Sequence, residues 1–221
     1  MRHFDEIRAI AADRKGGAAA LDAALAPDPD TPDLATLPDD RILATMARCI
    51  FQSGFNWKVV EAKWPGFEAG FAGFDPGRVA LYGDAELDRL LADKGVIRNG
   101  AKLSSVIENA GFVAGLARDH GSARSFFAGW PADDQVGLMQ VMAARGSRLG
   151  GNTGQYVLRF IGRDGFILSR DVVARLTAEG VIDGPATSKR ALAAIQAAFN
   201  TWAAQSGRSL REISRTLAFS I

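Results

Sequence analysis

The stretch of sequence that decides the fold reads RGSRLGGNTGQY, from Arg145 to Tyr156. It separates two segments whose apolar residues recur at helical spacing. Gly150, Gly151 and Gly154 let the backbone turn tightly and bring its N–H groups close to a phosphate. Because the following helix directs its positive N-terminal end at the same anion, the stretch predicts a phosphate-binding hairpin. The alternative is a plain helix connection, which is what most glycine-rich turns are.

Basic residues surround this hairpin. Between Val141 and Arg175 the chain has six arginines but only two acidic residues, Asp164 and Asp171. Asp171 is thus a carboxylate in a strongly positive neighbourhood, which suits chemistry on a nucleic-acid backbone, although an Asp there can also cap the helix that it opens. The residues predicted to hold backbone phosphates are Arg145, Arg148, Gly150, Gly151, Asn152, Thr153 and Gly154.

The composition is that of a globular protein, with 221 residues, 48% of them apolar and 23% charged, and a net charge of +1. The single cysteine, Cys49, excludes an internal disulfide and a cysteine-built zinc or iron–sulfur site. No apolar run approaches the ~20 residues needed to span a membrane, and the N-terminus lacks a secretory apolar region. We therefore predict a cytoplasmic protein without a membrane partner.

Helical periodicity dominates the chain, and no alternating run indicates a strand, so an all-α fold is predicted. Four of the eight prolines fall between Pro27 and Pro38 and mark a linker. We expect residues 1–38 to form an N-terminal helix pair with this linker, and residues 39–221 to form a two-lobed helical domain with the hairpin at about 145–156. The expected helices cover about 2–14, 17–25, 39–53, 57–71, 84–95, 100–118, 133–144, 153–162, 171–178 and 188–205, with a last one from 209.

Several separate motifs occur in a characteristic order. They are FQSGFNW at Phe51–Trp57, FDPGRVA at Phe74–Ala80, IRNGAK at Ile97–Lys102 and the hairpin itself. In this order they resemble the helix-hairpin-helix DNA glycosylase superfamily, and within it most closely bacterial 3-methyladenine DNA glycosylase I. The resemblance covers roughly residues 40–175. It implies an all-α, two-lobed fold that binds damaged duplex DNA, in a protein of the bacterial nucleoid.

The chain departs from this family in ways that bear on chemistry. The family's structural zinc site needs Cys and His near both ends, but this chain has only His3, His120 and Cys49, so neither a metal nor another cofactor is predicted. Cys49 also stands where the family has its base-reading glutamate. Conversely, Asp171 lies where most other superfamily members place an aspartate behind the hairpin. Bifunctional members have a lysine nucleophile where this chain has Asn152 or Thr153, so no lyase activity is expected.

The resemblance assigns a base pocket to the segment around Trp57. A glycosylase must extrude the damaged nucleotide and stack its base on an aromatic surface, which Trp57 and Phe55 can supply. Gln52 and Asn56 carry amide groups for a base edge. The alternatives are that Trp57 belongs to the core, that Gln52 and Asn56 satisfy helix ends, and that Cys49 is a buried apolar filler.

The predicted function is a monofunctional, monomeric DNA glycosylase that hydrolytically releases an alkylated, 3-methyladenine-like base, with Asp171 as its catalytic carboxylate. One alternative is a non-catalytic DNA-binding protein that keeps the hairpin and has lost base excision. Another is a helical protein-interaction domain, which an absence of DNA binding at low salt would favour.

Overall fold

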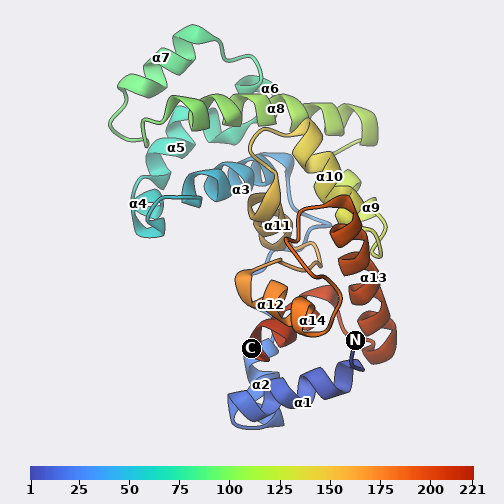
Figure 1. Cartoon of the computed structure of the whole chain (residues 1–221). Coiled ribbons are helices and arrows are strands. Elements are labelled where there is room, and N and C mark those ends of the chain that lie inside the picture. The colour runs from blue at the N-terminus through green and yellow to red at the C-terminus, as the bar shows by residue number, and fades with distance from the viewer. The chain divides into compact units, whose positions relative to one another are not determined.

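The computed structural model describes residues 1–221 and contains helices but no strands, which confirms the all-α prediction (Figure 1). The contacts group the chain into two compact units. The first unit comprises residues 1–31, 131–138 and 164–221, and the second comprises residues 32–130 and 139–163. None of the helices is both long enough and apolar enough to cross a membrane.

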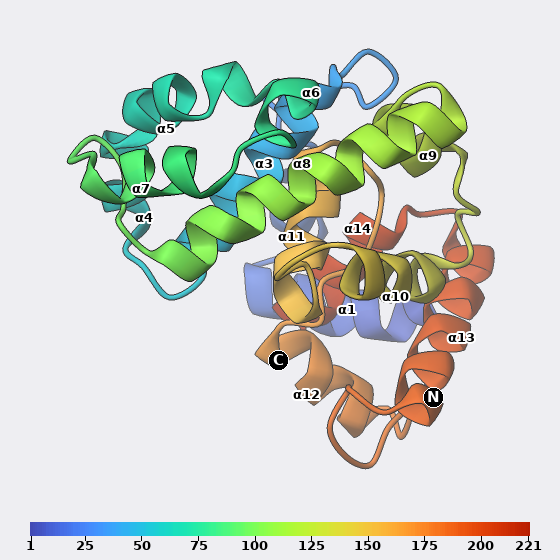
Figure 2. The ribbon, with the colours of Figure 1, turned by 90° about the horizontal axis from the view of Figure 1, so that it is seen from above.

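The second unit holds most of the motifs. Its longest helix, α8 (Gly100–His120), crosses α3 (Asp39–Gln52), and α3 also packs against α11 (Gly151–Phe160) (Figure 2). The other elements of this unit are α4 (Trp57–Ala62), α5 (Trp64–Gly70), the short 3-10 turn η1 (Ala72–Phe74), α6 (Pro76–Val79), α7 (Asp84–Ala92), α9 (Ala123–Gly129) and the C-terminal part of α10 (Gln135–Arg145).

Helix α3 forms because its apolar residues share one face. Ile42, Met46 and Ile50 recur at four-residue spacing and are buried. Phe51 extends this face and meets the ring of Phe67 on α5, with 4.5 Å between the ring centroids. Burying one such side chain contributes about 1.5–3 kcal/mol, so this face fixes α3 against its neighbours.

The single helix expected over residues 57–71 is wrong, because the structure divides it at Lys63 into α4 and α5. Pro65 lies in the first turn of α5, where its missing N–H leaves no helical hydrogen bond unmade. Two short helices, α6 and α9, were also not predicted. Each begins at a capping side chain, since Asp75 accepts from Arg78 N and Ser122 accepts from Ser125 N.

The hairpin lies where the sequence predicts a turn between helices. Helix α10 ends at Arg145 and α11 begins at Gly151, two residues before the expected start. The connection itself is therefore residues 146–150.

In the first unit, α14 (Leu210–Phe219) packs against α1 (Phe4–Lys15), α12 (Arg170–Ala178) and α13 (Lys189–Ser206), and α1 packs against α2 (Ala18–Leu25). Asp164 accepts hydrogen bonds from the backbone N–H groups of Leu210 and Arg211, both at 2.9 Å, and so caps α14. The predicted N-terminal helix pair is present, and its residues belong to the same compact unit as the C-terminal helices. A domain boundary at residue 38 stays a prediction.

Candidate functional site

A cavity of about 190 Å³ opens in the second unit where the end of α3, the start of α4 and the first two turns of α11 come together. This volume is below the ~300–1,000 Å³ that is typical for drug-sized ligands, so it suits a single ring system rather than a whole nucleotide. The lining residues are Cys49, Gln52, Ser53, Trp57, Asn152, Thr153, Tyr156 and Phe160, among which there is no acidic or basic side chain.

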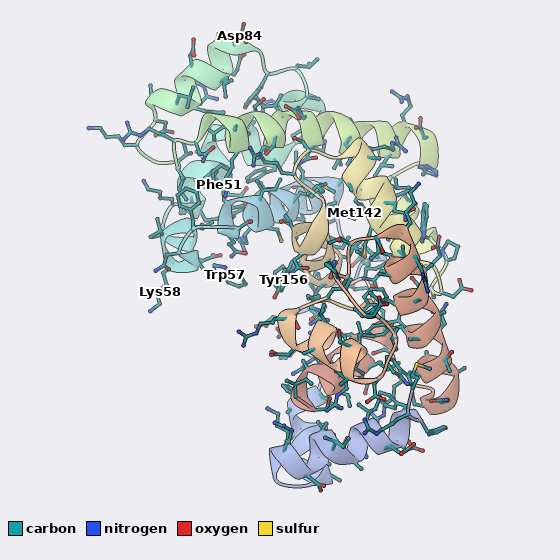
Figure 3. All side chains as sticks on the ribbon, in the orientation of Figure 1. Phe51, Trp57, Lys58, Asp84, Met142 and Tyr156 are labelled. Carbon is teal, nitrogen blue, oxygen red and sulfur yellow. The ribbon has the colours of Figure 1, made fainter.

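Aromatic side chains form much of this pocket. Trp57 is the first residue of α4 and is 51% exposed, so it is not a core tryptophan. Tyr156 and Phe160 lie one turn apart on α11 with their rings nearly parallel, at 5.9 Å between centroids. Figure 3 shows the Trp57 and Tyr156 side chains approaching one another from α4 and α11. A flat ring could stack between these two faces.

A carboxylate outside the lining fixes the amide of Gln52. Gln52 is buried, and its Nε2 atom donates a hydrogen bond to Glu61 at 3.2 Å. Because an ionised carboxylate only accepts, the nitrogen must face Glu61, and the Gln52 Oε1 atom is left as an acceptor. Glu61 in turn lies 3.7 Å from the Arg48 guanidinium.

Cys49 is both a pocket residue and a buried one, with 5% of its surface exposed. Burial raises the pKa of its thiol to about 12, against a small opposing effect of the Arg48 charge. The thiol is therefore protonated at neutral pH and is neither an anion nor a nucleophile. The pocket carries no negative charge at this position.

Lys102 on α8 supports the pocket from behind. Its Nζ atom donates to the carbonyl oxygens of Ile50 at 2.7 Å and Ser53 at 2.5 Å, and more weakly to that of Phe51 at 3.4 Å. Burial lowers the pKa of Lys102, and the positive charge of Arg148 adds to the effect. The ammonium lies at the negative C-terminal end of α3, where it satisfies carbonyls that the helix leaves unpaired.

The hairpin backbone is tightly packed, and two of its glycines are needed for that reason. A Cβ atom at Gly154 would lie 2.2 Å from the carbonyl oxygen of Leu149, and one at Gly146 would lie 2.8 Å from that of Met142. No side chain caps the first turn of α11 at Gly150, so the N-terminal end of that helix is open to an anion.

Both predicted phosphate-binding arginines are exposed, and the backbone of Arg148 has a positive φ of 57°. Arg145 lies over the ring of Phe112, and its guanidinium is 3.9 Å from Asp119. The predicted phosphate residues Asn152 and Thr153 line the pocket instead of facing away from it.

Two predicted pocket residues lie outside the lining. Asn56 caps α4 by accepting a hydrogen bond from Lys58 N at 2.9 Å, which is the helix-end alternative. The Phe55 ring lies 4.6 Å from Lys102 Nζ and belongs to a separate hollow with Val59 and Val96.

The sequence reasoning missed Ser53, Tyr156 and Phe160 as pocket residues. A signal was available for the last two. Asn152, Tyr156 and Phe160 recur at four-residue spacing and therefore lie on one face of α11. If Asn152 lines the pocket, this spacing predicts that Tyr156 and Phe160 line it too.

Asp171 lies in the first turn of α12, in the first unit. Ser169 caps this helix by accepting from Val172 N at 3.3 Å, so the alternative that Asp171 is the cap is wrong. The Asp171 side chain is 50% exposed and lies 3.7 Å from Arg170 Nε. Its carboxylate is thus accessible to a ligand.

The comparisons with known proteins agree with the motifs. Residues 36–145 match the family model of methyladenine glycosylase. A segment of 59 residues, 27% of this chain, is 37% identical to DNA-3-methyladenine glycosylase 1 of Escherichia coli (strain K12). It spans 32% of that relative, about a third of its length.

Solved structures share the fold. A 3-methyladenine DNA glycosylase I structure aligns with a TM-score of 0.51 and 22% identity over 60% of this chain and 81% of the other. The Staphylococcus aureus 3-methyladenine DNA glycosylase I aligns with a TM-score of 0.50 and 19% identity over 57% and 77%. The chain therefore has the fold of 3-methyladenine DNA glycosylase I and carries, in residues 36–145, the sequence pattern of the methyladenine glycosylase family, as its motifs indicated.

Proposed function

We propose that the chain is a monofunctional DNA glycosylase that flips a damaged, alkylated, 3-methyladenine-like base out of duplex DNA and releases it by hydrolysis. The observation that carries this proposal is the small pocket in which Trp57 and Tyr156 face one ring-sized space beside the amide of Gln52. The Staphylococcus aureus relative is described as recognising 3-methyladenine, which supports an alkylated purine as the substrate.

In this proposal the pocket binds the base by stacking and reads its edge through amides. Gln52 Oε1 accepts from an amino group of the base, because its Nε2 atom is already bonded to Glu61. An alkylated purine leaves readily, since it carries positive charge in DNA and becomes neutral as the bond breaks. The uncharged lining, with Cys49 as a neutral thiol, suits the neutral leaving base better than the cationic one.

In this proposal the hairpin binds the phosphates of the DNA backbone. Arg148 and Arg145 supply positive charge, and the uncapped end of α11 supplies backbone N–H groups. Such contacts fix the register of a duplex without reading its sequence.

Asp171 remains the proposed catalytic carboxylate. As the glycosidic bond breaks, the sugar becomes an oxocarbenium-like cation, and an ionised Asp171 would stabilise it and orient the attacking water. Its local environment permits this role. Ser169 relieves it of capping, and its pair with Arg170 is solvent-exposed on both sides and therefore weak.

The proposal includes no lyase activity, and the position of the lysines supports this. No lysine lines the pocket, and Lys102 behind it directs its ammonium at the carbonyls that end α3. An amine held in this way is not available to attack a sugar.

The test is release of bases from methylated duplex DNA, resolved by chromatography. We expect release by the unaltered chain, a loss of at least about 100-fold in Asp171→Asn, and little change in Asp183→Asn, an exposed aspartate of the same unit. Equal rates in Asp171→Asn and Asp183→Asn would remove Asp171 from the mechanism.

The second candidate function is a DNA-binding protein without base excision. The substitution of Cys49 for the glutamate of similar enzymes favours it, because it removes a base-reading carboxylate. DNA binding without release of any base from a broad panel of damaged duplexes would establish this alternative. An absence of DNA binding at low salt would reject both functions.

A further inference from the structure

Two buried polar side chains project from the same face of α8. Lys102 is 8% exposed and Asn109 is 0% exposed. They are seven positions apart, which is two helical turns and about 10 Å along the axis. One bonds the turn that ends α3, and the other bonds the hairpin.

The Lys102 contact reaches the pocket itself. Its Nζ atom bonds the carbonyl oxygen of Ser53, and Ser53 is a lining residue. The turn after α3 leads directly to Trp57. By bonding Ser53, Lys102 therefore holds in place the start of the turn that connects α3 to Trp57.

The Asn109 contact holds the hairpin at two points. Its Nδ2 atom donates to Ser147 O at 2.9 Å, and its Oδ1 atom accepts from Ser147 N at 2.8 Å. One amide thus satisfies both backbone groups of one residue. Ser147 directly precedes Arg148, whose backbone is left-handed. By holding the backbone of Ser147, Asn109 therefore fixes the position at which Arg148 begins.

We propose that Lys102 and Asn109 are positioning residues, and that α8 braces the base pocket and the phosphate-binding hairpin at a fixed separation. This inference rests on the proposed function. In a flipped nucleotide the base and its flanking phosphates are covalently linked, so their span is fixed. A protein that binds both at once needs its two sites at that span, and a displacement of about 1 Å is costly.

A purely structural role would make the same contacts, so a control is needed. Ser105 lies between the two residues on the buried face of α8 and is 1% exposed. Its Oγ atom donates only to Lys102 O, within its own helix. Ser105→Ala therefore removes a buried hydrogen bond of α8 without touching the hairpin or the pocket turn.

The experiment compares Asn109→Leu, Lys102→Met and Ser105→Ala with the unaltered chain, each at a temperature where it is folded. Binding to undamaged duplex is measured against salt concentration, and base release is measured in single turnovers at saturating protein. Asn109→Leu should weaken DNA binding about tenfold and reduce the slope of log K against log salt by about one, the contribution of one phosphate contact.

Lys102→Met should leave that slope unchanged and slow base release at saturation, while Lys102→Arg should restore part of the rate. Ser105→Ala should change neither. If Asn109→Leu does not fold, Asn109→Ser replaces it, because the smaller polar side chain leaves room for a bridging water.

The inference is overturned if the unaltered chain releases bases but Asn109 and Lys102 variants behave like Ser105→Ala, or if all three lose only thermal stability. If the unaltered chain neither binds duplex DNA nor releases bases, the proposed function fails together with the brace.

Discussion

Glu61 accepts a hydrogen bond from Gln52 Nε2 at 3.2 Å, although Glu61 itself does not line the pocket. The carboxylate thereby decides which end of the Gln52 amide is free. A residue outside the cavity thus sets the polarity of an atom that the proposed base would meet.

Removing this carboxylate should reduce base recognition with little effect on stability. In Glu61→Ala the Gln52 amide loses its partner and can turn over, and the loss of one hydrogen bond of about 1 kcal/mol predicts about fivefold slower release at low substrate. Glu61→Gln keeps an oxygen acceptor and should retain most of the rate. Single-turnover release from methylated duplex measures both. The same rate in Glu61→Ala and in the unaltered chain would show that the orientation of Gln52 is irrelevant.

Gly154→Ala should destabilise the protein because the new Cβ would lie 2.2 Å from the Leu149 carbonyl oxygen, and this backbone atom cannot turn aside. Overpacking of this kind costs about 1–3 kcal/mol. The matched control is Gly111→Ala, in the middle of α8, where a Cβ meets nothing within 4 Å. That change should stabilise by about 0.5–1 kcal/mol, because alanine favours a helix interior. Denaturant unfolding measures both, and equal effects would contradict the close approach.

The pKa of Cys49 gives a prediction about pH. Burial raises this pKa from 9.0 to about 12 in the folded protein. The protonated thiol is thus favoured by folding, and its contribution to stability is fully present below pH 9 and is lost as the pH rises toward 12. Cys49→Ala should lose less stability over this interval than the unaltered chain. Iodoacetamide at pH 8 should label the folded protein far more slowly than the denatured one, and fast labelling of the folded protein would contradict the burial.

Cys49 also separates what sequence predicts from what it does not. The resemblance carried by FQSGFNW assigned Cys49, Gln52 and Trp57 to one pocket, because the spacing of residues around a single helix end is local information. The same motif left open whether Asn56 reads a base or caps a helix, since an amide before a helix suits both uses. The brace from α8 could not be predicted either, because Lys102 and Asn109 act on residues about 40–50 positions away in the sequence.

The fold was predicted better than its divisions. Periodicity identified α3, α8 and α11, where apolar faces are long, but it ran through Lys63 without a break. Pro65 was the available signal for this break, because proline is favoured in the first turn of a helix. Asp164 shows the opposite limit. In the sequence, Asp164 counted only as one of the two acidic residues among the arginines around the hairpin. In the structure it caps α14, a helix that begins 46 positions later in the chain and that only the tertiary fold places beside it.

Arg148→Gly should have two opposite effects, and their combination tests the role of this residue. Arg148 has a positive φ of 57°, a conformation that costs a residue with a side chain about 1–2 kcal/mol and costs glycine little. The variant should therefore be more stable to denaturant. It should also bind undamaged duplex more weakly, with the salt slope reduced by about one, because a phosphate contact is lost. Arg78→Gly, a change of an exposed arginine on α6, should leave DNA binding unaltered. If Arg148→Gly gains stability and keeps its full salt dependence, Arg148 does not hold a phosphate, and the anion site reduces to Arg145 and the backbone of α11.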